Sequence, residues 1–117
     1  MRAGLLSVLA MLVVASPAYP HAALERAVPP VGSEVAVAPR QILLTFTEGV
    51  EPAFSTIELR GPGGSAVPIG SPQTANGNKR QLSVELPALP GGQYTVVWHA
   101  TSVDTHKTEG SFRFTVH

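Results

Sequence analysis

Short segments in which apolar and polar residues alternate recur along this chain, and turn-forming residues separate them. The clearest two cover residues 94–99 and 111–116, where every second side chain is aromatic or aliphatic. A period of two is typical of strands that have one buried and one exposed face. Eleven glycines and eleven prolines are spread between such segments, and no stretch has a helical period over a useful length. The chain is therefore predicted to form many short strands and few helices.

Seven extended segments are expected, at the regular spacing of an antiparallel sandwich. With 117 residues, of which 44% are hydrophobic, the chain is long enough for one domain with one core and too short for two. Residues 71–79 are polar and are expected to form a loop. The seven segments are an edge strand within residues 27–33, where prolines preclude a central strand, and residues 41–46, 54–60, 67–69, 81–86, 94–99 and 111–116.

Residues 1–20 have the layout of a secretory signal peptide. Arg2 is followed by an apolar run over residues 4–15 and then by small residues and prolines. The run is too short for a membrane span and lacks a following cluster of charges that would stop its transfer. Export is therefore expected, with a mature domain of residues 21–117 that has no membrane span.

Composition excludes several classes of site and partner. Cysteine is absent, and both methionines, Met1 and Met11, lie in the segment expected to be removed. Disulfides, zinc–thiolate sites and thiol catalysis are therefore excluded, and a bound metal must be held by nitrogen and oxygen. The formal net charge is zero and no run of Lys or Arg occurs, which argues against a nucleic-acid partner because phosphate binding needs clustered cations.

The two clearest strands flank a loop that contains Asp104-Thr105-His106. Asp104 is the only aspartate of the chain, and it lies two positions before one of the four histidines. If the segment is extended, this spacing places both side chains on one face, where a carboxylate and an imidazole would bind a metal or move a proton. The alternative is an ordinary polar loop, because short motifs of this kind often occur without a function.

His21 strengthens the metal interpretation. If the mature chain begins there, its α-amine and imidazole are two ligands from one residue, and adding Asp104 and His106 gives three nitrogens and one oxygen. Such a donor set suits tetragonal Cu(II). The position of cleavage stays open, since Ala18 offers small residues for recognition whereas cleavage before His21 would place Pro20 at the scissile bond. His21 as a disordered tail residue is the alternative.

Taken together, these motifs resemble the CopC copper-resistance proteins of the bacterial periplasm. The resemblance covers essentially the whole mature chain and follows the order of that family. The segments that carry it are His21-Ala-Ala-Leu, Pro29-Pro-Val-Gly-Ser, Leu44-Thr-Phe-Thr-Glu, Phe54-Ser, residues 86–98, Ser102-Val-Asp-Thr-His and Gly110-Ser-Phe-Arg-Phe.

The resemblance implies a small immunoglobulin-like Greek-key β-sandwich that binds or carries copper outside the cytoplasm, with a membrane copper transporter of the CopD type as partner. By it, His21, Asp104 and His106 match the Cu(II) ligands, and Glu48 matches an acidic position close to them. The methionine-rich loop by which some members bind Cu(I) has no counterpart here, which implies a Cu(II)-only member. Tyr19-Pro20 before His21 departs from the family pattern.

Other interpretations of the same residues differ in what they expect of the site. Glu48 is either a solvated acid or a group that orients a ligand histidine, and His99 is either a surface histidine or a neighbour of the ligands. No enzymatic activity is expected. A copper oxygenase built on a histidine brace and a metal-free docking sandwich are the rival functions.

Overall fold

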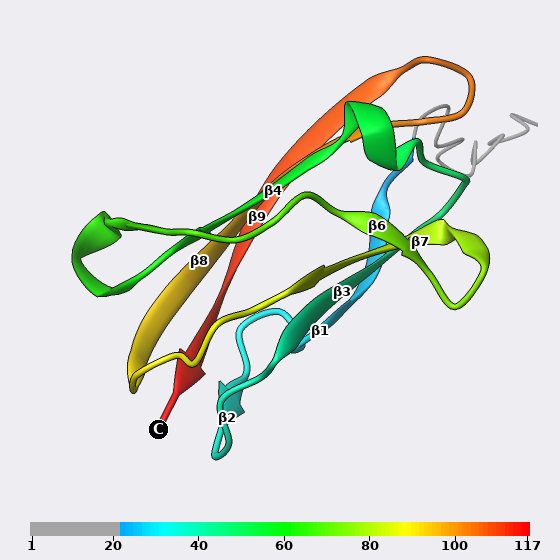
Figure 1. The fold of residues 1–117 in the computed structure, drawn as a ribbon. Coiled ribbons are helices and arrows are strands. Elements are labelled where there is room, and N and C mark those ends of the chain that lie inside the picture. The colour runs from blue at the N-terminus through cyan, green and yellow to red at the C-terminus, as the bar shows by residue number, and fades with distance from the viewer. Residues whose placement is uncertain (1–21) are drawn as a thin grey trace, which may run out of the picture.

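Two β-sheets pack face to face in the computed structural model, which describes residues 22–117 (Figure 1). Within this range the helices are two three-residue 3-10 turns, η1 (Pro52–Phe54) and η2 (Pro62–Gly64), and none is long and apolar enough to cross a membrane. The first sheet has the order β1-β3-β7-β6, and the second has the order β2-β9-β8-β4-β5. The strands are β1 (Leu24–Val28), β2 (Glu34–Val35), β3 (Gln41–Phe46), β4 (Thr56–Arg60), β5 (Ala66–Val67), β6 (Gln73–Ala75), β7 (Asn78–Glu85), β8 (Gly92–Thr101) and β9 (Lys107–Val116).

The expected fold class, an all-β immunoglobulin-like sandwich, is confirmed. Besides the excursion of the short β2 to the second sheet, the chain crosses from the first sheet to the second between β3 and β4, returns between β5 and β6, and crosses again between β7 and β8. Crossovers of this kind distinguish a Greek-key sandwich from a simple meander. The predicted signal peptide, residues 1–20, and the predicted ligand His21 lie outside the described residues.

Residues 22–117 form nine strands, two more than expected. The prediction of a polar loop at residues 71–79 is wrong, because this segment contains β6, a turn and the beginning of β7. Asn76 and Gly77 form the turn, with φ angles of +55° and +65°. Asn-Gly is the preferred pair where both central residues of a two-residue turn have positive φ. The other additional strand, β2, pairs over two residues with β9 in parallel.

The β8–β9 hairpin is longer than the alternation predicts. Its antiparallel ladder runs without interruption from Gly92 opposite Val116 to Thr101 opposite Lys107. Only residues 102–106 are therefore left as the connecting loop, and both of its ends are held by the ladder. Figure 1 shows this loop at one end of the sandwich, close to η1, with the C-terminus at the opposite end.

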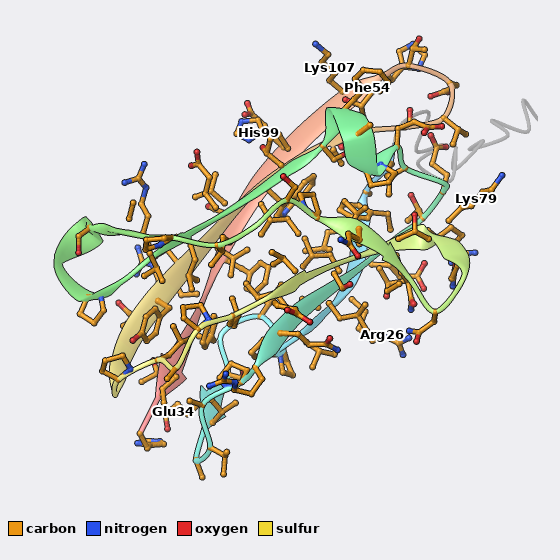
Figure 2. All side chains as sticks on the ribbon, viewed as in Figure 1. Arg26, Glu34, Phe54, Lys79, His99 and Lys107 are labelled. Carbon is orange, nitrogen blue, oxygen red and sulfur yellow. The ribbon has the colours of Figure 1, made fainter. Side chains whose placement is uncertain are left out.

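The core lies between the sheets and is formed by the inward positions of each strand. Trp98, one of the alternating apolar residues of the segment 94–99, is 6% exposed and meets the ring of Phe46 edge-on at 5.2 Å between centroids. Figure 2 shows side chains filling the space between the sheets, whereas the labelled charged side chains point away from it: Arg26, Glu34, Lys79 and Lys107.

Candidate metal centre

The loop that joins β8 to β9 is a tight turn closed by its own main chain. The amide of Ser102 donates to the carbonyl of His106 at 2.8 Å, and the amide of Thr105 donates to the carbonyl of Ser102 at 2.9 Å. Thr105 has a φ of +73°, a conformation that is uncommon for a β-branched residue. The sequence-based prediction placed Asp104 and His106 on one face by assuming an extended segment. That assumption is wrong, because the segment is a turn.

The turn brings the two side chains together nevertheless. Oδ2 of Asp104 lies 3.1 Å from Nδ1 of His106, and each side chain is about half exposed. If the carboxylate accepts the Nδ1–H, the Nε2 atom of the neutral imidazole retains its lone pair for a metal. The turn thus presents an anionic oxygen and an imidazole nitrogen from neighbouring positions at the open end of the sandwich.

Hydrogen bonds keep the Asp104 carboxyl ionised. The hydroxyl of Ser102 donates to Oδ1 of Asp104, and this bond, followed by the bond from His106, lowers the pKa of Asp104 below its ordinary value of 3.8. Donors that face a carboxylate stabilise its charged form more than its protonated form. The Asp104 carboxyl is therefore anionic at any pH at which histidine is neutral.

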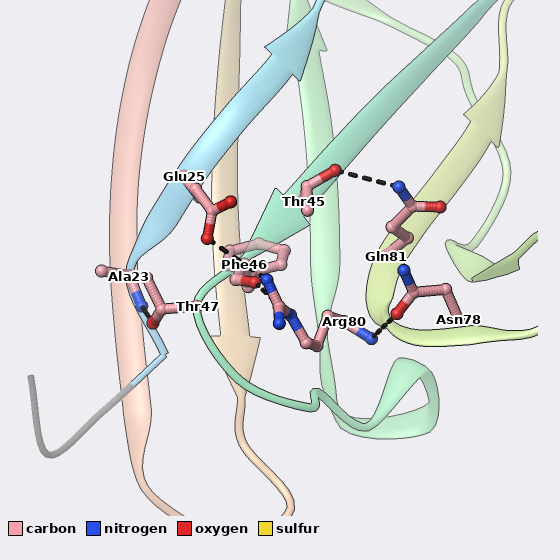
Figure 3. A network of polar contacts seen from close by, with 8 residues as sticks. All are labelled: Ala23, Glu25, Thr45, Phe46, Thr47, Asn78, Arg80 and Gln81. Atoms are coloured by element: carbon pink, nitrogen blue, oxygen red, sulfur yellow. Dashed lines mark hydrogen bonds and ion pairs between the residues drawn. The ribbon is translucent and has the colours of Figure 1, made fainter.

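The first described residues are fastened beside this loop. The hydroxyl of Thr108, two positions after His106, donates to the carbonyl of Ala22 at 2.7 Å. Ala23 donates its amide to the hydroxyl of Thr47 at 2.9 Å and accepts the amide of Thr47 at 2.8 Å (Figure 3). Ala22 is 1% exposed. The residue to which His21 is covalently bonded is thus held between the end of β3 and the beginning of β9.

The guanidinium of Arg80, a residue of β7, contacts the end of β3 and the beginning of β1. Its Nε donates to the carbonyl of Phe46 at 3.1 Å, and its NH2 group lies 3.3 Å from Oε2 of Glu25 (Figure 3). Strand β1, which begins two residues after Ala22, is thereby attached to β7 across the end of β3. These contacts are largely exposed, so their role is to fix geometry and their contribution to stability is small.

Glu48 is the other acidic group at this end. It follows Thr47 and is half-buried, and its Oε1 atom is buried without a hydrogen-bond partner among residues 22–117. A buried carboxylate oxygen that has no donor is costly. An N–H group or a cation next to Glu48 would remove that cost.

His99 lies on the outward face of β8, as its position after Trp98 predicts. Its Nε2 is 2.8 Å from Oε2 of Glu109, and its Nδ1 is 3.5 Å from Oγ1 of Thr56. Figure 2 shows His99 on the flank of the sandwich, below the end where Lys107 lies. Within the described residues, its recorded partners are Glu109 and Thr56, so the structure does not bring it together with Asp104 and His106.

Residues 22–117 contain no group of three or more His, Asp or Glu side chains that could hold a metal ion. The described part of the predicted site consists of Asp104 and His106, and the other donors expected of it belong to His21. The hydroxyl of Ser102 donates to Asp104, yet sequence reasoning does not single out this residue, which is only the first of the segment Ser102-Val-Asp-Thr-His. A serine two positions before an isolated acid gives no signal of its own at the level of sequence.

The sequence of this chain matches one protein family model and several relatives. Residues 24–117 match the family model described as the CopC domain. The protein named YobA from Escherichia coli K12 is 37% identical over 112 residues, which cover 95% of this chain and 90% of that protein. Copper resistance protein C from Escherichia coli is 37% identical over 110 residues, 88% of this chain and 86% of the relative.

Solved structures give the same result. The crystal structure of CopC from Methylosinus trichosporium OB3b superimposes with a TM-score of 0.78 at 34% identity, covering 82% of this chain and 93% of that one. The crystal structure of PcoC, a methionine-rich copper resistance protein from Escherichia coli, superimposes with a TM-score of 0.75 at 33% identity, covering 83% of this chain and 99% of that one. The family model, the relatives and the shared sandwich together establish that this chain belongs to the CopC family of copper resistance proteins.

Proposed function

We propose that the mature protein is an exported, non-enzymatic carrier that binds one Cu(II) ion through the amine and imidazole of His21, the carboxylate of Asp104 and the imidazole of His106. One observation carries the proposal. Asp104 and His106 lie 3.1 Å apart on a closed turn, and Thr108 of the same hairpin binds the carbonyl of Ala22. Since His21 is bonded to Ala22, this contact supports a site to which both ends of the sequence contribute.

The donor set favours Cu(II) over Cu(I). The site would supply three nitrogens and one anionic oxygen, and Cu(I) prefers the soft sulfur of cysteine or methionine. The chain has no cysteine, and its two methionines are Met1 and Met11. PcoC is described as methionine rich, and this chain differs from it in that respect. Among divalent ions, the general affinity order places Cu(II) above Ni(II) and Zn(II).

Glu48 fits the same proposal as a group that orients a ligand. Its Oε1 has no partner among residues 22–117 and belongs to the residue after Thr47, which binds Ala23. A ligand histidine commonly donates its second N–H to a carboxylate. Asp104 supplies a full negative charge directly to the ion, which stabilises Cu(II) relative to Cu(I) and so opposes redox cycling. We therefore propose binding and transfer of copper rather than oxygenase chemistry.

A membrane copper transporter of the CopD type is the proposed partner. The copper transport protein CutJ of Bacillus subtilis is 29% identical to this chain over 99 residues, and those residues are 18% of CutJ. A domain similar to this chain is thus part of a larger protein named for copper transport. We propose that the separate domain performs the corresponding step outside the cytoplasm, in the periplasm, by handing Cu(II) to such a transporter.

Intact mass measurement of the secreted protein, with and without added Cu(II), tests the proposal. The expected result is a chain that starts at His21 and gains the mass of one copper ion. Competitive Cu(II) titration of His106→Ala and Asp104→Ala should show much weaker binding than the parent. His99→Ala and His117→Ala are matched controls, because each removes an exposed histidine paired with a glutamate away from the site. Equal losses in all four variants would refute the assignment of ligands.

A further inference from the structure

Ser102 contacts both Asp104 and His106 from beneath the loop. It is completely buried, at 0% exposure, although the two residues that it contacts are exposed. Its hydroxyl is bonded to Oδ1 of Asp104, and the amide of His106 donates to the same hydroxyl at 3.2 Å. A single buried oxygen therefore lies between the side chain of one proposed ligand and the main chain of the other.

The proton of this hydroxyl has a definite place. A serine hydroxyl has one proton to donate and two lone pairs that accept. The hydroxyl also lies 3.2 Å from the carbonyl oxygen of His106, but an anionic carboxylate is the stronger acceptor, so the hydroxyl donates its proton to Oδ1 of Asp104. The lone pairs then accept the amide of His106, whose carbonyl is held by the amide of Ser102 itself. With Oδ1 occupied, Oδ2 is the oxygen that Asp104 presents beside the imidazole of His106.

Ser102 is anchored in turn by the connection between the two sheets. It forms a β-bridge with Val50, and the amide of the next residue, Val103, donates to the carbonyl of Gly49 at 3.0 Å. The amide of Val50 donates to the carbonyl of Lys79 at 2.9 Å, which ties the same segment to the β6–β7 hairpin. The hydroxyl is thus mounted on main chain that is fixed on both sides, as a preorganised site requires.

We infer that Ser102 is a positioning residue for copper: in the metal-free protein it fixes the Asp104 carboxylate and the His106 main chain so that both ligands already face one point. The inference rests on the proposed function for the identity of the metal. The order of the loop is a property of the metal-free protein, and that part of the inference is independent of the proposed function. Copper would then bind without first ordering these two residues, and the cost of ordering would not reduce the affinity.

Ser55 provides the matched control. It is also a buried serine, 5% exposed, and its hydroxyl donates to the carbonyl of Glu51 at 2.7 Å and accepts the amide of Thr101 at 3.1 Å. The partners of Ser55 recorded in the described chain are main-chain groups. Ser55→Ala and Ser102→Ala thus remove the same atom from two buried sites, and Ser55 binds the amide of Thr101, the residue before Ser102. Only the second change releases a proposed ligand.

The experiment has an arm without copper and an arm with copper, both on the protein that starts at His21. In the first, amide hydrogen exchange at residues 103–106 and the χ1 couplings of Asp104 and His106 are measured by NMR. The unmodified protein should show one rotamer for each side chain, and Ser102→Ala should speed exchange at His106 at least tenfold. In the second, Cu(II) is titrated against a competing chelator, and the electron paramagnetic resonance spectrum of the bound ion is recorded.

Ser102→Ala should weaken Cu(II) binding about tenfold, the lower end of what loss of a group supporting a ligand produces, and should alter the Cu(II) spectrum. Ser55→Ala should leave the affinity and the spectrum unchanged. Ser102→Thr keeps the hydroxyl, so it should have the affinity and the spectrum of the unmodified protein. Unchanged affinity and spectrum in Ser102→Ala would overturn the inference. If Ser102→Ala does not fold, rotamer averaging at Asp104 or His106 in the unmodified protein would overturn it, and single rotamers together with a normal Ser102→Thr would support it.

Failure of the proposed function gives a different result. The unmodified protein would then bind no Cu(II) in the second arm, whereas the first arm would still decide whether Ser102 holds the loop.

Discussion

Replacing Gly110 by alanine should destabilise the hairpin that carries the loop, because Gly110 is where the indole of Trp98 crosses β9. The two residues are directly opposite in the β8–β9 ladder. A β-carbon at Gly110 would lie 2.6 Å from Cζ2, 2.8 Å from Cε2 and 3.0 Å from Nε1 of Trp98. Carbon atoms pack best at about 3.5–4.0 Å, so the ring or the strand must move by roughly 1 Å.

The structure also sets the size of the effect. Trp98 is 6% exposed and packs edge-on against Phe46, so it cannot move into open space. Forcing an extra carbon into such packing costs about 1–3 kcal/mol, and alanine recovers about 0.4–1 kcal/mol by restricting the unfolded chain. The net loss of unfolding free energy should be about 1–2 kcal/mol, which lowers the melting temperature by about 4–8 °C per kcal/mol in a domain of this size.

Urea denaturation followed by tryptophan fluorescence measures this loss, since Trp98 is the only tryptophan of the chain. Gly70→Ala is the matched control, because a β-carbon there meets nothing within 4 Å and the backbone has no positive φ. It should leave stability within about 0.5 kcal/mol of the parent. In a Trp98→Phe background, followed by circular dichroism, Gly110→Ala should cost less because the nearest ring atoms are gone. A Gly110→Ala protein as stable as the Gly70→Ala control would refute the reasoning.

The remaining predictions concern the metal and the charge of the loop. A protein that starts at Tyr19 should bind Cu(II) at least about tenfold more weakly than one that starts at His21, since the amine becomes an amide and Pro20 has no N–H to deprotonate; competitive titration of the two forms and of His21→Ala measures this, and equal affinity of the first two would exclude the amine as a ligand. Cu(II) affinity should fall between pH 8 and pH 5, because protons compete with the metal for the imidazoles of His21 and His106; a constant affinity over that range would indicate a carboxylate-only site. The lowered pKa of Asp104 implies stability that is fully present above its unfolded value near 3.8 and is lost as the pH falls through the lower folded pKa. Asp104→Asn should therefore be less stable than the parent at pH 6, and the difference should shrink below pH 3 in denaturation curves; a difference independent of pH would assign the effect to shape rather than charge.

The amino-acid sequence by itself determined the fold class and the candidate ligands in this protein. Alternation with a period of two is a local property, so strands such as residues 94–99 and 111–116 can be identified without knowing what they pack against. The chemical content of Asp104 and His106 is equally local, and so is the absence of sulfur ligands after residue 20. The donor chemistry of His21 adds it to these residues if the mature chain begins there, and the family resemblance implies the same set of ligands.

Predictions from local sequence were wrong where a strand depends on pairing with another segment. Residues 71–79 are largely polar, and β6 within them lies at the edge of its sheet. The polar composition favours a loop, although Asn76-Gly77 is a pair typical of a hairpin turn. The extension of β8 and β9 to Thr101 and Lys107 depends on each strand pairing with the other, which the composition of either strand does not reveal.

Only the tertiary structure decided how the candidate site is assembled. Ala22 is held by Thr108, 86 positions away in the sequence, and a bond over that separation exists only after both sheets have formed. Ser102 is buried because β8 ends under the bridge to Val50, and that burial makes its hydroxyl a fixed support for Asp104 and His106. Residue type specifies which atoms can bind a metal, whereas the packing of distant segments specifies where those atoms lie, because the energy that holds them comes from contacts that no single segment contains.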